Sequence, residues 1–242
     1  MLIARLNRMG ALAELQRTDE AISCFDEIVL ICDGFDSGGA QGLEVRIRED
    51  HGSALCMKSE ILLRQGKLEE ALAASDEVVE RFGADQHPEV RRGVALSLTT
   101  RAAVLHHFER WQEEIDAYNE ILATYSKDRS FRDIGLNARC SKVGLLLQLG
   151  RCEDAVHACA DIRRGFRNDR AVQVTTTIFE VDGYRGRGQH KKALKACDEV
   201  VDLIRSDPDV GSRRLVAHVL RLKASRSGHS VEGRGSVGVR GN

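Results

Sequence analysis

Apolar and polar positions follow a helical period along most of the chain, and one such pattern occurs five times. The clearest copy is LEEALAASDEVV at 68–79, and the others are TDEAISCFDEIV at 18–29, QEEIDAYNEIL at 112–122, CEDAVHACADIR at 152–163 and HKKALKACDEVV at 190–201. Residues three or four positions apart lie on the same face of a helix. Each copy therefore predicts an amphipathic helix with one apolar face.

Two positions are alike in nearly every copy. One position is small in four copies: it is the fourth residue of each twelve-residue copy and the third residue of the shorter copy at 112–122. The aligned residues are Ala21, Ala71, Glu114, Ala155 and Ala193. Seven residues later the side chain is always β-branched, at Ile28, Val78, Ile121, Ile162 and Val200. The intervals between copies shorten from 50 to 43, 41 and 38 residues. This uneven spacing indicates stacked units joined by loops of different length.

Each copy follows a second helical stretch that ends in a turn. The turns are centred on Gln16, Gly66, Glu109, Gly150 and Gly188. Glycine tolerates the left-handed conformation that ends a helix, so each turn is expected to separate a helix A from the following helix B. Four residues before the turns lie Leu12, Leu62, Leu105, Leu146 and Tyr184, and seven before lie Met9, Ser59, Ala102, Val143 and Val181. This stripe predicts that helix A packs against helix B.

The segment Lys58 to Gly83, KSEILLRQGKLEEALAASDEVVERFG, resembles a tetratricopeptide repeat of the longer bacterial type. The resemblance implies an all-α fold, a right-handed α-solenoid of about five helix-turn-helix repeats plus a C-terminal capping helix. We expect the solenoid to cover 1–226, with repeats at about 2–33, 43–83, 88–127, 130–168 and 170–206 and the capping helix at 208–226. Residues 227–242, rich in Gly, Ser and Arg, are expected to form a disordered tail.

Composition narrows the class of protein. The formal charge of the 242 residues is -1, which makes nucleic acid unlikely as the main partner. No stretch is long and apolar enough for a membrane span. The seven cysteines include no Cys-x-x-Cys pair, as in a reducing compartment. These features, and an excess of Arg over Lys, favour a cytoplasmic bacterial protein.

Motifs for chemistry are weak. Gly233, Gly235 and Gly238 form a G-x-G-x-x-G pattern, but too few residues follow to build the helix that would bind a pyrophosphate. Cys152 and Cys159 flank His157, yet they are seven residues apart, about 10 Å along a helix, which is too far to share one zinc ion. The sequence therefore predicts a noncatalytic chain with no catalytic residue, no cofactor and no metal site.

A protein or peptide partner is the function that the repeats favour, bound in a concave groove lined by helix A. The exposed side of helix A is expected six, three and two residues before each turn. The predicted partner-binding residues are Glu60, Leu63, Arg64, His106, His107, Leu147, Gln148, Asp182 and Arg185. The Lys, Arg and Asn clamp by which some family members bind acidic chaperone tails is missing, because the tenth position before the turns holds Leu6, Cys56, Thr99, Cys140 and Ile178.

Two other readings stay open. The chain starts inside a helix A with no polar cap before Leu2 and Ile3, so this end is expected to stack on another copy or on an upstream part of a longer protein. In the latter case the repeats would be the regulatory or sensor module of a larger, possibly enzymatic protein. A weaker alternative is an RNA-associated protein, because 211–242 hold seven Lys and Arg against one acidic residue.

Overall fold

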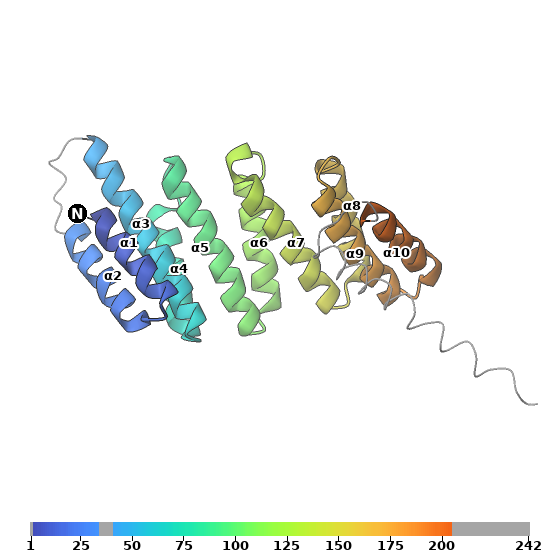
Figure 1. The fold of residues 1–242 in the computed structure, drawn as a ribbon, viewed down its shortest axis with the longest axis horizontal. Helices are drawn as coiled ribbons and strands as arrows, with labels where there is room; N and C mark the ends of the chain where they lie inside the picture. Colours follow the sequence, from blue (N-terminus) through green and yellow to red (C-terminus); the bar gives the residue numbers. More distant parts are fainter. Residues whose placement is uncertain (1, 34–40, 205–242) are drawn as a thin grey trace, which may run out of the picture. The chain divides into compact units, whose positions relative to one another are not determined.

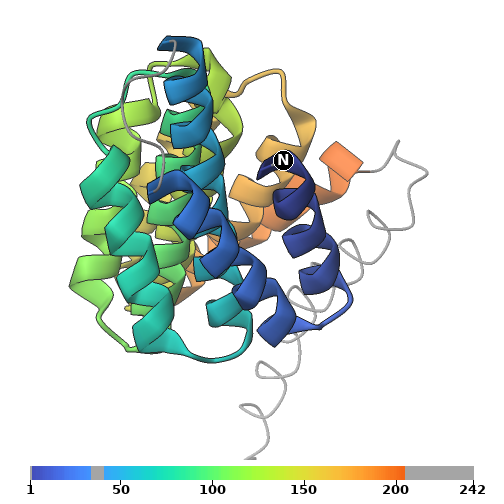
Figure 2. The same ribbon diagram turned by 90° about the vertical axis from the view of Figure 1, so that its left-hand side faces the viewer.

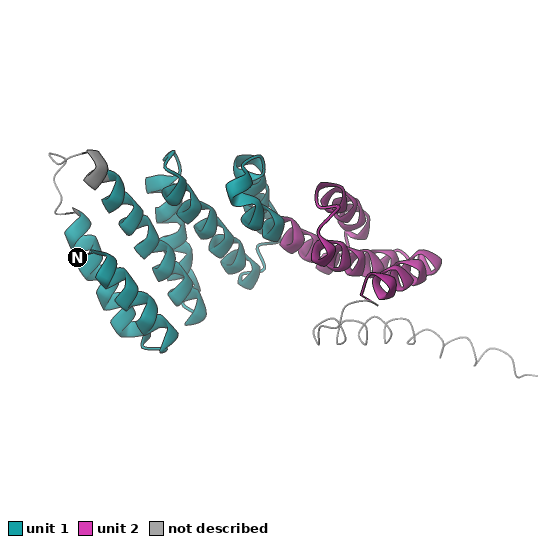
Figure 3. Cartoon of the chain, turned by 45° about the horizontal axis from the view of Figure 1, so that its top comes forward, with its two compact units in different colours: residues 1–138 teal, residues 139–242 magenta. Residues whose placement is uncertain are grey.

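The computed structural model describes residues 2–33 and 41–204, and their regular elements are all helices. The chain divides into two compact units, 1–138 and 139–242 (Figure 3). The predicted capping helix at 208–226 and the predicted tail at 227–242 lie outside the described residues. No helix in the described ranges is long and apolar enough to cross a membrane.

Unit 1 contains three helix pairs in chain order (Figure 1). They are α1 (Leu2–Glu14) with α2 (Thr18–Asp33), α3 (Gln41–Arg64) with α4 (Leu68–Phe82), and α5 (Pro88–His107) with α6 (Trp111–Tyr125). The pairs pack in sequence, since α3 contacts both helices of the first pair and α5 both helices of the second. Figure 2 shows α1 and α2 side by side. A short 3-10 helix, Arg129–Phe131, then leads into α7 (Arg132–Gln148), which crosses into unit 2.

In unit 2, the later part of α7 is followed by α8 (Cys152–Gly165), α9 (Arg170–Gly186) and α10 (His190–Ile204). Helix α9 contacts α8 and α10. The buried cluster between α9 and α10 contains Val174, Val181, Ala196, Cys197, Val200 and Ile204. The helix-turn-helix pattern of unit 1 thus continues here with the same type of core.

All five predicted turns have the left-handed backbone. Positive φ values occur at Gln16 (59°), Gly66 (73°), Glu109 (56°), Gly150 (71°) and Gly188 (69°). In the second turn, the N–H of Lys67 donates to the carbonyl of Leu62 at 3.0 Å, and the four other turns repeat this bond. This is the Schellman arrangement, which satisfies carbonyl groups that a helix end leaves open. The prediction of a helix end at each turn is confirmed.

The predicted stripes form the core. Met9, Ser59, Ala102, Val143 and Val181 are all buried, and so are the four leucines of the next column; Tyr184, the fifth member, is partly exposed. The helix B columns are buried too, from Ala21 to Ala193 and from Ile28 to Val200. Pro88 occupies the first turn of α5, where its missing N–H costs no hydrogen bond.

Candidate interaction surface

A pocket of about 510 Å³ lies between the two A helices α3 and α5 of unit 1. Its lining consists of Ser53, Cys56, Met57, Glu60 and Leu63 from α3 and of Glu89, Arg92, Gly93, Leu96, Thr99, Thr100 and Ala103 from α5. Two predicted binding residues, Glu60 and Leu63, are among them. Both walls belong to unit 1, so the pocket is built within one compact part of the chain.

The two walls use the same positions of successive repeats. Positions are counted back from the turn at Gly66 for α3 and from the turn at Glu109 for α5. Position thirteen holds Ser53 in α3 and Leu96 in α5, position ten holds Cys56 and Thr99, position nine holds Met57 and Thr100, and position six holds Glu60 and Ala103. Small or short side chains at most of these positions leave room between the helices. Of these four positions, only position six was predicted from the sequence to bind a partner. Positions nine, ten and thirteen were missed, although the same helical period extends to them.

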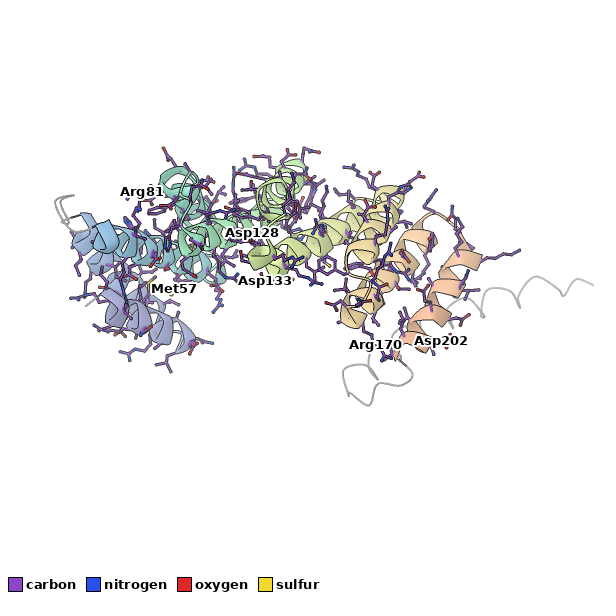
Figure 4. All side chains as sticks on the ribbon, turned by 90° about the horizontal axis from the view of Figure 1, so that it is seen from above. Met57, Arg81, Asp128, Asp133, Arg170 and Asp202 are labelled. Atoms are coloured by element: carbon purple, nitrogen blue, oxygen red, sulfur yellow. The ribbon has the colours of Figure 1, made fainter. Side chains whose placement is uncertain are left out.

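The pocket is mainly apolar. Leu96 is 46% exposed, which is unusual for a large aliphatic side chain, and it faces the open space between the helices. Leu63 is half-buried against the core beneath. Met57 lies between α3 and α1 (Figure 4), close enough that a Cβ on Gly10 would be 3.9 Å from its sulfur. A flexible thioether at this place allows the pocket to adapt to different occupants.

Cys56 contributes a thiol to the pocket but not a nucleophile. Its Sγ donates to the carbonyl oxygen of Gly93 at 3.1 Å and lies 3.0 Å from the hydroxyl of Ser97. Burial raises the pKa of the Cys56 thiol to about 11. Thiolate is the reactive form, and it is rare at neutral pH when the pKa is so high. Cys56 therefore serves as a small polar contact between α3 and α5.

Charged residues surround the pocket. Arg64 Nη2 donates to Glu60 Oε1 at 2.5 Å on the exposed surface of α3. Arg92 points to the first turn of α7, where Nη2 lies 2.7 Å from Asp133 Oδ2. Glu89, in the first turn of α5, forms no ion pair with the described residues. The end of the pocket at Glu89 therefore carries a carboxylate that no described cation contacts.

His106 and His107 differ in their surroundings. His107 is exposed. His106 Nδ1 lies 3.0 Å from Oε2 of Glu114, a carboxylate with a side chain only 3% exposed. The hydroxyl of Tyr118 donates to the same carboxylate at 3.2 Å, and the His106 ring packs edge-on against Trp111 with centroids 5.2 Å apart. His106 is thus tied to helix B by a carboxylate in the alanine column.

The remaining predicted residues belong to unit 2. Gln148 is exposed, and Asp182 and Arg185 are partly exposed with their charged groups 3.6 Å apart. Leu147 is partly buried near α9, since a Cβ on Gly183 would be 3.6 Å from its Cδ2. The structure therefore divides the predicted set, with five residues in unit 1 and four in unit 2.

Unit 2 holds a partly buried ionic cluster that the sequence did not reveal. Arg163 of α8 donates to Glu180 of α9 at 2.9 Å and also bonds Glu199 of α10. Burial raises the pKa of Glu180, although the nearby Arg163 acts in the opposite direction. Gln173 completes the cluster by donating to the carbonyl oxygens of Arg163 and Phe166. These bonds join three helices, so we assign them a structural role.

No ligand cluster for a metal is present in 2–33 and 41–204, because these residues place no three His, Cys, Asp or Glu side chains close together. All seven cysteines are free thiols. Cys159 is buried in the core, and burial raises its pKa to about 12.

Comparison with solved structures gives the fold a name. A tetratricopeptide repeat protein from Parabacteroides merdae aligns with 95% of this chain and 76% of its own, with a TM-score of 0.63 and 13% identity. Repeats assigned to a kinesin light chain of Podospora anserina align over 86% of this chain and 97% of their own, with a TM-score of 0.65 and 13% identity. The chain has the tetratricopeptide-repeat fold.

A third similar structure is that of a repeat protein for which a peptide-binding site is described. YrrB, reported as a TPR protein with an unusual peptide-binding site, aligns with 91% of this chain and 92% of its own at a TM-score of 0.52 and 13% identity. No protein-family model and no curated protein matches the sequence. The TPR fold accounts for the regular columns of this chain and for the pairing of its A and B helices, both of which the sequence predicted.

Proposed function

We propose that the chain is a noncatalytic interaction scaffold or regulator that binds a segment of another protein along the exposed faces of its A helices. The observation that carries the proposal is the pocket between α3 and α5, which offers an exposed leucine and a half-buried one next to polar side chains. Peptide grooves combine apolar anchor sites with polar groups in this way. The fold shared with YrrB, a TPR protein with an unusual peptide-binding site, supports the same function.

A regulator without catalysis also fits the chemistry of the described residues. The pocket thiol has a pKa of about 11, and the His106 and Glu114 pair is anchored to a helix rather than placed in a cleft with a nucleophile. A cytoplasmic location, a role as the sensor part of a larger protein, self-association through the N-terminal end and RNA binding through 211–242 all stay predictions from the sequence.

The proposal is tested with a matched pair of substitutions. Leu96→Lys places a charge in the pocket, whereas Leu30→Lys introduces the same change at a leucine of α2 that is 74% exposed and outside the pocket. Both sites are solvent-accessible, so both variants should fold, which circular dichroism would verify. The tagged full chain and both variants are then used to isolate crosslinked partners from lysate of the source organism, followed by mass spectrometry.

Loss of the same partner with Leu96→Lys but not with Leu30→Lys would support binding at the A helices. Equal recovery with all three proteins, or loss with Leu30→Lys alone, would place the contact elsewhere and overturn the proposal. Crosslinks from the partner to α3 and α5 give a second, independent readout, because they depend on proximity rather than on affinity.

A further inference from the structure

The pocket between α3 and α5 has an uneven distribution of charge, and this bears on what it binds. Glu89 stands seven residues before Leu96 on α5, so both side chains lie on the same face. On α3, Asp50 lies three residues before the pocket residue Ser53. Glu89 is thus part of the lining, and Asp50 lies on the same face of α3 as Ser53, about one turn before the lining begins.

Among the described residues, neither Asp50 nor Glu89 forms an ion pair. Asp50 is partly buried, and this burial, together with the neighbouring Glu49, raises the pKa of its carboxyl in spite of Arg46. A raised pKa is the sign of a carboxylate whose negative charge is poorly compensated. A cation supplied by a ligand would compensate it.

The nearest cation of the lining is held away from this end. Arg92 lies between Glu89 and Leu96 in the sequence, but its guanidinium bonds Asp133 at 2.7 Å and the carbonyl oxygen of Ser130 at 3.3 Å. The bond from Arg92 lowers the pKa of Asp133, so Asp133 is ionised at neutral pH and retains the guanidinium. Asp133 thus acts as a positioning residue that keeps Arg92 out of the acidic end.

The spacing of these features gives a register for the ligand. Seven residues of helix separate Glu89 from Leu96, which is about 10 Å at 1.5 Å per residue. An extended peptide advances about 3.3 Å per residue, so about three residues cover the same distance. Resting on the proposed function, we infer that the pocket binds an extended peptide with an apolar side chain against Leu96 and a Lys or Arg three positions away against Asp50 and Glu89.

Short fluorescein-labelled peptides of glycine and serine test this. One carries Leu and, three positions on, Lys; a second has the two in reverse order; in a third Glu replaces the Lys; and in a fourth Ser replaces the Leu. Binding to the full chain is measured by fluorescence anisotropy at low salt. One of the two Lys peptides should bind about fivefold or more tightly than the Glu peptide, because two exposed ion pairs are replaced by two repulsions. The Ser peptide should bind weakly.

Three variants separate charge from structure. Glu89→Lys should abolish the preference for the Lys peptide or reverse it, whereas Glu80→Lys, an exposed change on α4, should leave it intact. Asp133→Asn should weaken the Lys peptide several-fold and the Ser peptide hardly at all, because it releases Arg92 toward the pocket. A merely structural effect of Asp133 would weaken all peptides equally.

Several outcomes would overturn the inference. They are equal binding of the Lys and Glu peptides, tighter binding of the Glu peptide, no binding of any peptide at millimolar concentration, or occupation of the pocket by a second copy of the chain, seen as dimer formation that Leu96→Lys prevents. These results leave the proposed function standing if the partner isolated with the intact chain is still lost with Leu96→Lys. Failure of that isolation test would instead remove the proposed function itself.

Discussion

The pair formed by His106 and Glu114 offers a quantitative test of how this repeat is built. Glu114 occupies the column where four other repeats have alanine, and its side chain is 3% exposed. His106 is 44% exposed, so its removal costs little packing but leaves the carboxylate without its imidazole partner. A buried carboxylate deprived of a partner costs about 1–3 kcal/mol. Because water can reach the vacated space, we expect about 1–2 kcal/mol for His106→Ala.

Glu114→Ala should behave differently. It removes the buried charge together with its need for a partner, and replacing buried ionic groups by apolar ones is often neutral or stabilising. The small cavity left by the lost methylene groups opposes this gain, at about 24 cal/mol per Å³. We therefore expect a change within about 1 kcal/mol, and in the Glu114→Ala background His106→Ala should cost less than about 0.5 kcal/mol. The resulting coupling energy is about 1–2 kcal/mol.

The assay is urea unfolding, followed by circular dichroism and by the fluorescence of Trp111. Trp111 is the single tryptophan of the sequence and lies 5.2 Å from the His106 ring, so it reports on this part of unit 1. His107→Ala, at the exposed neighbour, is the control and should change stability by less than about 0.5 kcal/mol. Equal costs of His106→Ala with and without Glu114 would refute the argument.

Three other predictions follow from the turns, the ionic cluster and the buried thiol. Glu109→Gly should stabilise the fold by about 1 kcal/mol and Gly150→Ala should destabilise it by about as much, because both positions have positive φ and a Cβ at Gly150 meets no neighbour; thermal unfolding checks both. Because the pKa of Glu180 is raised in the folded state, its contribution to stability is fully present below about pH 4 and is lost as the pH rises through the folded-state pKa. In urea unfolding, the stability of unit 2 should therefore fall less between pH 4 and pH 7 in the Glu180→Gln variant than in the parent chain. An equal fall in both proteins would contradict this. Cys159, with its pKa raised to about 12, should react with a thiol reagent at neutral pH only after unfolding, and rapid alkylation of Cys159 in the native chain, located by mass spectrometry, would be inconsistent with its burial.

The sequence was most informative where structure depends on local rules. A helix end requires a left-handed residue, and this made the turn at Gly66 predictable; Gln16 and Glu109 followed from their places in the repeat. The alanine column was predictable because close helix crossing excludes larger side chains. The same column also contained the signal for the exception, since a glutamate at 114 requires a polar partner when buried.

The pocket was only partly predictable. Glu60 and Leu63 were found because they lie near a turn that could be located, whereas Leu96 lies thirteen residues before its turn, where small errors in helix phase accumulate. The direction of the Arg92 side chain depends on Asp133 of another helix, and no pattern within α5 contains that information. The ion pairs between helices depend on tertiary packing and were therefore absent from the predicted site.

The shared construction of the pocket has a consequence for how such proteins change over time. Since the α3 wall and the α5 wall come from equivalent positions of successive repeats, the pocket belongs to the junction between repeats rather than to either one. Duplication of a helix pair within the array would add a whole junction in one genetic event, and a single substitution in the duplicated pair would alter two adjoining junctions at once, one on each side. Ligand preference in this architecture can therefore evolve by changes in repeat number as well as by changes of individual residues.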